Sequence, residues 1–214
     1  MICIENLTRT YKKGNEYINA VQNFNLNVKK GEFVVVSGPS GSGKTTLLLS
    51  IGAMLKPTIG KVFIEDQDIN VLNEAEKNDL RSKKLGFVFQ MFHLLPYLNI
   101  LDNIMLPVNN RKRENLFRAN ELINKFKLTH RKYHYPKELS AGEKQRVAIA
   151  RAMINEPDII LADEPTGNLD PENEKMIFNY LQDYNKNGGT VILVSHSSTA
   201  SDYAERTVYL KSPV

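Results

Sequence analysis

The stretch GPSGSGKT, residues 38–45, has the spacing G-x-x-x-x-G-K-[ST] of a loop that binds phosphate groups. Its three glycines allow the backbone to wrap around a phosphate chain with N–H groups pointing inward. Lys44 offers a positive charge to the outer phosphates, and Thr45 offers a hydroxyl ligand to Mg²⁺. We therefore expect a nucleotide site here, with contacts from Gly38, Pro39, Ser40, Gly41, Ser42, Gly43, Lys44, Thr45 and Thr46.

Two adjacent acids end the apolar run in DIILADEP, later in the chain. Carboxylate oxygens suit Mg²⁺, so Asp163 is predicted to belong to the shell of the metal. Glu164 is predicted to face the terminal phosphate and to accept a proton from the attacking water. The segment NKNG at 185–188 lacks the aspartate of a guanine-reading N-K-x-D motif, which argues against a GTPase. On these two motifs alone, a metabolite kinase remains an alternative.

The elements that must position these residues alternate between strands and helices. Short apolar, β-branched runs predict strands that are buried on both faces, and segments between them have helical character. The predicted strands are 32–37, 60–66, 84–90, 158–163, 190–195 and 206–211, and the predicted helices follow the glycine loop and Asn73 or span 140–155 and 172–186. This order predicts an α/β fold of the P-loop NTPase type, with a mostly parallel sheet.

Three regions of the chain differ in character. Two extended segments at the N-terminus predict an antiparallel β part over about 1–32. The nucleotide-binding core is expected over about 33–90 and 150–214. Between them, about 91–149, no strong strand signal appears, and apolar residues of 116–126 recur at three- and four-residue steps. A helical insert is therefore predicted there.

The composition is that of an ordinary globular protein, with 42% hydrophobic and 24% charged residues among 214. The single cysteine, Cys3, indicates a reducing compartment. The first residues lack the order of a signal peptide, and the longest apolar run is too short to span a bilayer. We therefore expect the chain not to enter or cross a membrane by itself.

Positive charge is concentrated in one segment. Residues 111–137 carry nine Lys and Arg against two acids, a balance of +7, so the other residues of this +4 chain sum to −3. A charge run of this kind is commonly a solvated helix face. The alternative is a surface that faces nucleic acid or lipid headgroups.

A series of short motifs, in order, resembles those of the ATPase subunits of ABC transporters, over essentially the whole chain. Besides the glycine loop and the paired acids, these are RTYKKG with Tyr11, GFVFQ with Gln90, LSAGEKQR at 139–146, NLD with Asp170 and LVSHS with His196. Taken singly, each is weak: Tyr11 could pack on a sheet edge, Gln90 could end a strand, and His196 could be a core histidine. Their common order favours the resemblance.

The resemblance implies two ATP molecules and two Mg²⁺ ions held between two copies in head-to-tail symmetry. The catalytic residues would be Glu164, His196 and Gln90, and the metal ligands would be Thr45, Gln90 and Asp163. Tyr11 would stack on the adenine. The other copy would contribute Ser140, Gly142, Glu143 and Asp170 in trans. Because a helix start attracts an exposed anion by only about 0.3–1 kcal/mol, dimer closure would depend on the γ-phosphate.

The chain departs from the family pattern at three positions. Ala141 replaces a usual glycine, Glu143 replaces the commonest glutamine, and Ser197 follows the histidine where an aspartate is frequent. Ser140 and Glu143 also have the spacing of a capping box, which would close the helix start on itself.

The partner implied is a transmembrane permease subunit on the cytoplasmic face of the bacterial inner membrane, docked near the helical insert. The span from Phe87 to Pro107 resembles the branch that serves macrolide exporters and lipoprotein release. No nucleic acid partner is expected. Two other functions remain open: a soluble ABC ATPase that acts on nucleic acid or the ribosome, and a catalytically weak, binding-only subunit, for which Ala141 is the only indication.

Overall fold

The computed structural model describes residues 1–108 and 112–212. Along the first part of the chain the elements are β1 (Ile2–Lys13), β2 (Glu16–Val28), β3 (Phe33–Ser37), α1 (Lys44–Ile51), β4 (Ile59–Ile64), β5 (Gln67–Asp68), α2 (Glu74–Lys84) and β6 (Leu85–Phe89). The remainder comprises α3 (Ile100–Ile104), α4 (Arg113–Lys125), two 3₁₀ turns, α5 (Ala141–Met153), β7 (Ile159–Asp163), α6 (Pro171–Lys186), β8 (Thr190–Val194), α7 (Ser198–Ser201) and β9 (Arg206–Tyr209).

Five parallel strands form the central sheet, in the order β6-β7-β8-β3-β9. Alternate residues of β3 enter different cores: Phe33 and Val35 join one hydrophobic cluster, and Val34 and Val36 join the other. This is the burial on both faces that a run of β-branched residues predicts. The predicted α/β fold with a parallel sheet is confirmed.

The antiparallel sheet has the order β2-β1-β4-β5. It confirms the antiparallel pairing expected for the first two segments, but it does not stop near residue 32. Residues 59–68 also belong to it, because β4 pairs along β1 with Ile2 opposite Ile64. The boundary of the antiparallel part was predicted wrongly, since strand patterns alone do not tell which sheet a strand joins.

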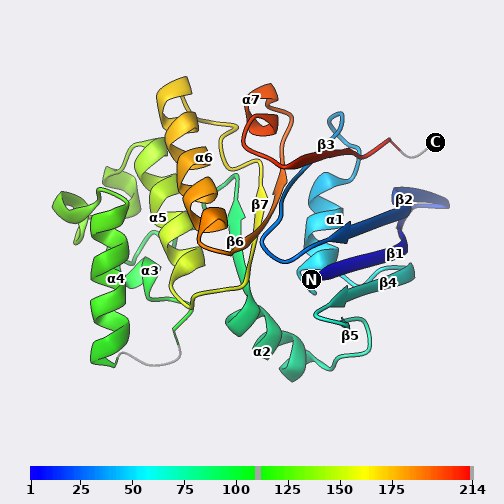
Figure 1. Cartoon of the computed structure of the whole chain (residues 1–214), viewed down its shortest axis with the longest axis horizontal. Coiled ribbons are helices and arrows are strands. Elements are labelled where there is room, and N and C mark those ends of the chain that lie inside the picture. Colours follow the sequence, from blue (N-terminus) through cyan, green and yellow to red (C-terminus); the bar gives the residue numbers. More distant parts are fainter. Residues whose placement is uncertain (109–111, 213–214) are drawn as a thin grey trace.

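Three layers lie side by side: the antiparallel sheet, the parallel sheet and a group of helices (Figure 1). One hydrophobic core lies between the two sheets, and another lies between the parallel sheet and the helices. The helix α1 lies between the two sheets, where Leu47, Leu48 and Ile51 are fully buried. The helices α3, α4, α5 and α6 cover the other face of the parallel sheet. The starts of α1 and α5 therefore lie on opposite sides of one sheet.

The region 91–149 contains helices and turns and no strand among its described residues. The amphipathic pattern is confirmed in α4, whose Ala119, Leu122 and Ile123 are buried against the core. The short helix α3, with Asn99 as its N-cap, was not predicted. The helix α5 runs past the expected end of the insert and packs on β6, so no break in structure occurs there.

Candidate functional site

The register of the parallel sheet brings four loops together. Phe89 pairs with Asp163, and Asp163 pairs with Val194, which in turn pairs with Val36 of β3. The next residues along each strand therefore emerge at the same carboxyl edge. They are Gln90, Glu164, Ser195 with His196, and the glycine loop that starts at Gly38.

The glycine loop places a bare helix start at this edge. Gly41 and Gly43 have φ of 81° and 89°, in the left-handed region that favours glycine. A Cβ on Gly43 would lie 1.9 Å from the carbonyl oxygen of Ala20, so no other residue fits. Gly43 also caps α1 without any side-chain hydrogen bond, and the first turn of α1 contains no acid. The exposed N–H groups and the helix dipole make this end attractive to phosphate.

Lys44 is folded back into the loop. Its Nζ donates to the carbonyl oxygens of Gly38 at 2.9 Å and Pro39 at 3.0 Å, and it is 9% exposed. Of the other predicted contacts, Pro39, Ser40, Gly41 and Thr45 are exposed. Ser42 has a buried hydroxyl oxygen without a partner. The loop thus holds a cation and polar groups in place for an anion.

Glu164 lies between Lys44 of the glycine loop and His196. Its Oε1 is 4.0 Å from Lys44 Nζ, and its Oε2 is 2.8 Å from His196 Nδ1. The backbone of Glu164 has φ of 45°, an unusual value for a residue with a side chain. The structure therefore brings together the glutamate, the histidine and the lysine singled out in the sequence, and the glutamate has a strained backbone.

Asp163 meets a structural test for a metal ligand. Its Oδ1 is buried without a hydrogen-bond partner among the described residues. Burial raises the pKa of the Asp163 carboxyl above its ordinary value, and the adjacent Glu164 adds to this, while a hydrogen bond with Thr45 and the charge of Lys44 oppose it. An orphaned buried carboxylate oxygen beside a threonine hydroxyl fits Mg²⁺, which prefers oxygen ligands.

Gln90 lies beyond the end of β6 and is exposed. Its amide nitrogen passes 2.9 Å from the position of a Cβ on Gly167, just after the paired acids. The loop that follows Gln90 is anchored by Arg151 of α5. The guanidinium of Arg151 donates to the carbonyl oxygens of Phe92 at 2.7 Å and His93 at 2.6 Å. The sequence analysis missed this anchor, because an arginine inside an amphipathic helix gives no sign of a distant carbonyl partner.

The start of α5 is closed by its own residues. Ser140 accepts from Glu143 N at 3.2 Å, and Glu143 Oε2 accepts from Ser140 N at 2.8 Å. The predicted capping box is therefore confirmed. Ala141 is exposed at the tip, and Gly142 is packed so closely on Asn173 of α6 that a Cβ would lie 2.3 Å from Asn173 Oδ1.

Glu143 is paired with a cation from the helical insert. Arg131 Nε lies 3.0 Å from Glu143 Oε1, and the glutamate is 9% exposed. Burial alone would raise the pKa of Glu143, but the hydrogen bonds from Ser140 and Arg131 outweigh it and hold the pKa below its ordinary value. Both carboxylate oxygens are thus engaged within the chain, and the contact in trans predicted for Glu143 stays a prediction.

Two other predicted residues lie at the edges of this surface. Asp170 caps α6 by accepting from Glu172 N and Asn173 N, and these bonds with Asn173 lower the pKa of Asp170. Tyr11 is 40% exposed, and the guanidinium carbon of Arg9 lies 4.8 Å from its ring centre. Tyr11 is therefore available for stacking, which stays a prediction.

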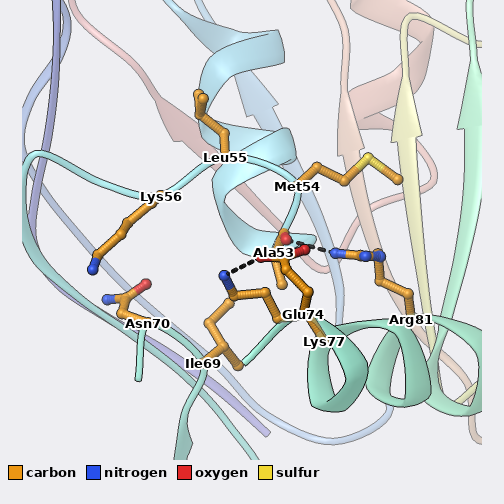
Figure 2. Close-up of a pocket in the computed structure, with 9 residues that line it drawn as sticks. All are labelled: Ala53, Met54, Leu55, Lys56, Ile69, Asn70, Glu74, Lys77 and Arg81. Carbon is orange, nitrogen blue, oxygen red and sulfur yellow. Dashed lines mark hydrogen bonds and ion pairs between the residues drawn. The ribbon is translucent and has the colours of Figure 1, made fainter. Parts of the chain in front are cut away.

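A separate hollow of about 520 Å³ lies at the opposite end of α1 from the glycine loop. Figure 2 shows Lys56, Lys77 and Arg81 around it, with Arg81 bonded to the carbonyl oxygen of Ala53. The eight residues of α1 span about 12 Å at 1.5 Å per residue, so this hollow is distinct from the phosphate cradle.

The chain is similar in sequence to a known protein family and to several of its members. Residues 21–167 match the family model described as ABC transporter. The chain is 46% identical to the ABC transporter ATP-binding protein MJ0796 of Methanocaldococcus jannaschii, over 99% of this chain and 93% of that protein. It is 43% identical to the lipoprotein-releasing system ATP-binding protein LolD of Aquifex aeolicus, over 89% of this chain and 87% of LolD.

Two further matches extend the comparison. The macrolide export ATP-binding/permease protein MacB of Chlorobaculum tepidum is 38% identical over 100% of this chain, which corresponds to 33% of MacB. A solved dimer of the MJ0796 cassette in a post-hydrolysis state, bound to ADP and Pi, superposes with a TM-score of 0.93 at 44% identity. That match covers 99% of this chain and 95% of the other.

Proposed function

The chain belongs to the ABC transporter family as an ATP-binding subunit that hydrolyses ATP, and on that premise we propose that two copies close head to tail around two ATP molecules. The observation that carries this proposal is the position of the two helix starts. The start of α1, at the glycine loop, and the start of α5, at Ser140, lie on opposite faces of one sheet. The tip of α5 is therefore placed to serve a nucleotide on a second copy, as the dimer of MJ0796 supports.

Each residue at the carboxyl edge has a task in ATP hydrolysis. Lys44 and the N–H groups of the loop neutralise the phosphates. The oxygen of a water molecule attacks the γ-phosphorus, the bond to the ADP oxygen breaks, and the proton of the water passes to Glu164. His196, 2.8 Å from Glu164, orients that carboxylate and the water. The products are ADP and phosphate, and the loss of the γ-phosphate removes the ligand of the α5 tip.

We assign Mg²⁺ to Asp163, Thr45 and Gln90. When bound there, the ion neutralises charge on the β- and γ-phosphates. The chain's own share is a carboxylate kept free in a buried setting and a hydroxyl held beside it. No group of three His, Cys, Asp or Glu side chains with metal-binding geometry occurs in the described part of the chain. A site with one carboxylate agrees with the usual coordination of Mg²⁺, in which one or two carboxylates and the phosphates of the substrate are ligands.

The test of the sandwich is the variant Glu164→Gln. It removes the proton acceptor and keeps the shape, so turnover should fall by about 10²–10⁴-fold, the usual share of a general base. ATP should still bind, and the variant should accumulate as an ATP-bound dimer in size-exclusion chromatography with light scattering. Turnover at the wild-type rate would refute the assigned base.

A bulky residue at the α5 tip tests the trans contact. Ser140→Trp should leave the binding of ATP to the monomer unchanged, because Ser140 lies away from its own loop. It should prevent dimer formation in the Glu164→Gln background. A dimer that forms equally well with Trp at this position would exclude the head-to-tail arrangement.

We propose that the membrane partner is a permease subunit and that it docks beside the loop after Gln90. No helix within the described ranges has the length and apolar character needed to cross a bilayer. A hollow of about 390 Å³ lies next to this loop, with mostly apolar side chains at its wall, including Met54, Phe87, Phe89, Leu106 and Pro107. A short helical segment of a permease fits such a surface, and the relatives LolD and MacB suggest lipoprotein release or macrolide export as the transported class.

The basic segment would place the subunit at the cytoplasmic face of an inner membrane with anionic lipids. Not all of its charges are available for this: Arg131 pairs with Glu143, and Arg118 pairs with Glu156 and binds carbonyl oxygens near the end of α5. Arg111 lies outside the described residues. Charge reversal at Lys125, Lys127 and Lys132 should weaken binding to vesicles that contain anionic lipid. Unchanged binding would count against this location.

A further inference from the structure

One carboxylate outside the predicted site joins the two loops that hold the base and the histidine. Glu174, in the first turn of α6, accepts from Ser197 Oγ at 2.7 Å and from Thr166 Oγ1 at 3.4 Å. Both bonds end on the same oxygen, Oε1. Glu174 is half-buried, and its backbone N–H is bonded to Asp170 as part of α6. The carboxylate is therefore held by a helix rather than by the loops that it connects.

The two hydroxyl groups sit directly behind the reacting pair. Ser197 follows His196, and Thr166 is two residues after Glu164. The histidine and the glutamate approach each other to 2.8 Å across a short gap between two strand ends. A bond from each loop to one oxygen limits how far the loops can separate. A misplacement of about 1 Å in a reacting group costs on the order of 10²-fold in rate, so such a restraint matters for turnover.

Backbone hydrogen bonds connect the histidine loop to β3 and to α7, but few side-chain bonds hold it among the described residues. His196 is exposed, and its N–H reaches Glu164 only at 3.4 Å. The N–H of Ser197 donates to Ser195 Oγ within the same loop, at 3.0 Å. Among the described residues, the side-chain hydrogen bond that ties Ser197 to a long helix is the one to Glu174. Ser197 is also a position at which the family often carries an aspartate, so here the carboxylate comes from α6.

We propose that Glu174 is a positioning residue for ATP hydrolysis, which keeps His196 and Glu164 together through Ser197 and Thr166. The inference rests on the proposed function, because it assigns the pair that Glu174 holds. It concerns the catalytic step alone: within the described residues, Glu174 makes no hydrogen bond or ion pair with the glycine loop or with the start of α5. Its loss should lower kcat and leave the affinity for ATP unchanged.

The first test compares three variants in steady-state hydrolysis with Mg²⁺ and ATP. Glu174→Ala should lower kcat by about tenfold, within the range that loss of orientation gives, with the Kd for ATP and the Tm close to wild type. Glu174→Gln keeps an acceptor oxygen for both hydroxyls and should retain most of the activity. Glu172→Ala is the matched control, because its carboxylate lies in the same helical turn and makes no bond to either loop in the described structure.

The second test moves the carboxylate from Glu174 on α6 to position 197 in the histidine loop. Ser197→Asp alone would set two carboxylates against each other, so it should lower kcat. In the Glu174→Ala background, Ser197→Asp supplies an acceptor for Thr166 from the histidine loop, and it should raise kcat at least threefold above that of Glu174→Ala. A merely structural role for Glu174 does not predict this reversal of the effect of one substitution.

Full activity of Glu174→Ala would overturn the proposal. So would a loss of kcat with a parallel loss of Tm that neither Glu174→Gln nor Ser197→Asp repairs. The variant Glu164→Gln separates this failure from that of the proposed function. If Glu164→Gln is inactive while Glu174→Ala is fully active, only the role of Glu174 is wrong. If Glu164→Gln turns over normally, the catalytic pair itself is wrong.

Discussion

The two helix starts that attract anions are built in opposite ways. The start of α1 has no side-chain cap, no acid in its first turn and a lysine folded over it. The start of α5 has a complete capping box, and the acid of that box is neutralised by Arg131. No side chain among the described residues caps the first helix start, whereas the second has already used one N–H group on Ser140.

In the proposed dimer, this difference separates the binding of ATP to one copy from the closure of the two copies around it. A lysine and several free N–H groups can hold a nucleotide on one copy. A partly satisfied helix start contributes about 0.3–1 kcal/mol toward an exposed anion, which is too little to bind ATP alone. It is enough to favour a dimer that contains a γ-phosphate over one that does not, so hydrolysis can open the dimer.

The largest expected effect removes the strong side of the comparison. Lys44→Ala deletes a charged donor, and a hydrogen bond to a charged group is worth about 1.5–3 kcal/mol, so ATP binding should weaken by at least tenfold. Isothermal titration with ATP measures this. Lys56→Ala is the control, because Lys56 lines the hollow at the opposite end of α1. Equal affinity of Lys44→Ala and wild type would show that the loop does not hold the phosphates.

A smaller effect is expected on the weak side. In Arg131→Gln the carboxylate of Glu143 loses its cation and, in the proposed dimer, would lie near the phosphate of the other copy. The repulsion should weaken ATP-dependent dimer formation about threefold to tenfold, since a charge at a helix start is worth about 0.3–1 kcal/mol and more where water is excluded. Sedimentation equilibrium in the Glu164→Gln background measures the dimer.

The second substitution Glu143→Gln should restore dimer formation in Arg131→Gln, because it removes the uncompensated charge. ATP binding to the monomer should stay unchanged in both variants, which separates this effect from that of Lys44. If the double variant dimerises no better than Arg131→Gln, the pair acts through folding rather than through charge.

The smallest expected effect is on the free energy of unfolding, through Asp163 at the carboxyl edge of the parallel sheet. The native pKa of Asp163 is raised by burial, so the folded state binds a proton more readily than the unfolded state. Its ionised form therefore lowers stability above that pKa, and stability recovers as the pH falls through it. Asp163→Asn removes this penalty and should raise the Tm at neutral pH without Mg²⁺ and ATP. A gain of about 1 kcal/mol corresponds to 2–4 °C for a domain of this size.

The same variant should lose ATP hydrolysis, because it lacks the carboxylate assigned to Mg²⁺. Its advantage in Tm should shrink as the pH falls through the raised pKa of Asp163 and this carboxyl becomes protonated in the wild type, which calorimetry over a series of decreasing pH values can follow. A lower Tm than wild type at every pH would contradict the view that the buried oxygen is kept free at the expense of stability.

The residues at the carboxyl edge of the parallel sheet could be predicted from the sequence because each of them follows a strand. A β-branched run ends at Asp163 or at Val36, and parallel strands align their carboxyl ends, so Lys44, Glu164 and His196 had to meet. The capping box was predictable for the same reason, since Ser140 and Glu143 are three residues apart.

The contacts that cross between elements could not be predicted. Arg131 reaches Glu143, Arg151 reaches Phe92, and Glu174 reaches Ser197, and each pair depends on how a helix rotates on the sheet. In the sequence, each of these residues is one charge among many on an amphipathic helix. The sheet that β4 joins was missed likewise, because strand character carries no information about the partner strand.

One consequence follows from the length of α5. Its 13 residues span about 20 Å, with Ser140 at one end and Arg151 near the other, and Arg151 grips the backbone just past Gln90. A stiff rod cannot be tilted at one tip alone. A rotation of α5 on binding of a second copy would therefore also shift Phe92 and His93, which lie beside the apolar hollow. In this way α5 can couple the presence of nucleotide to the surface at which we propose that the permease docks.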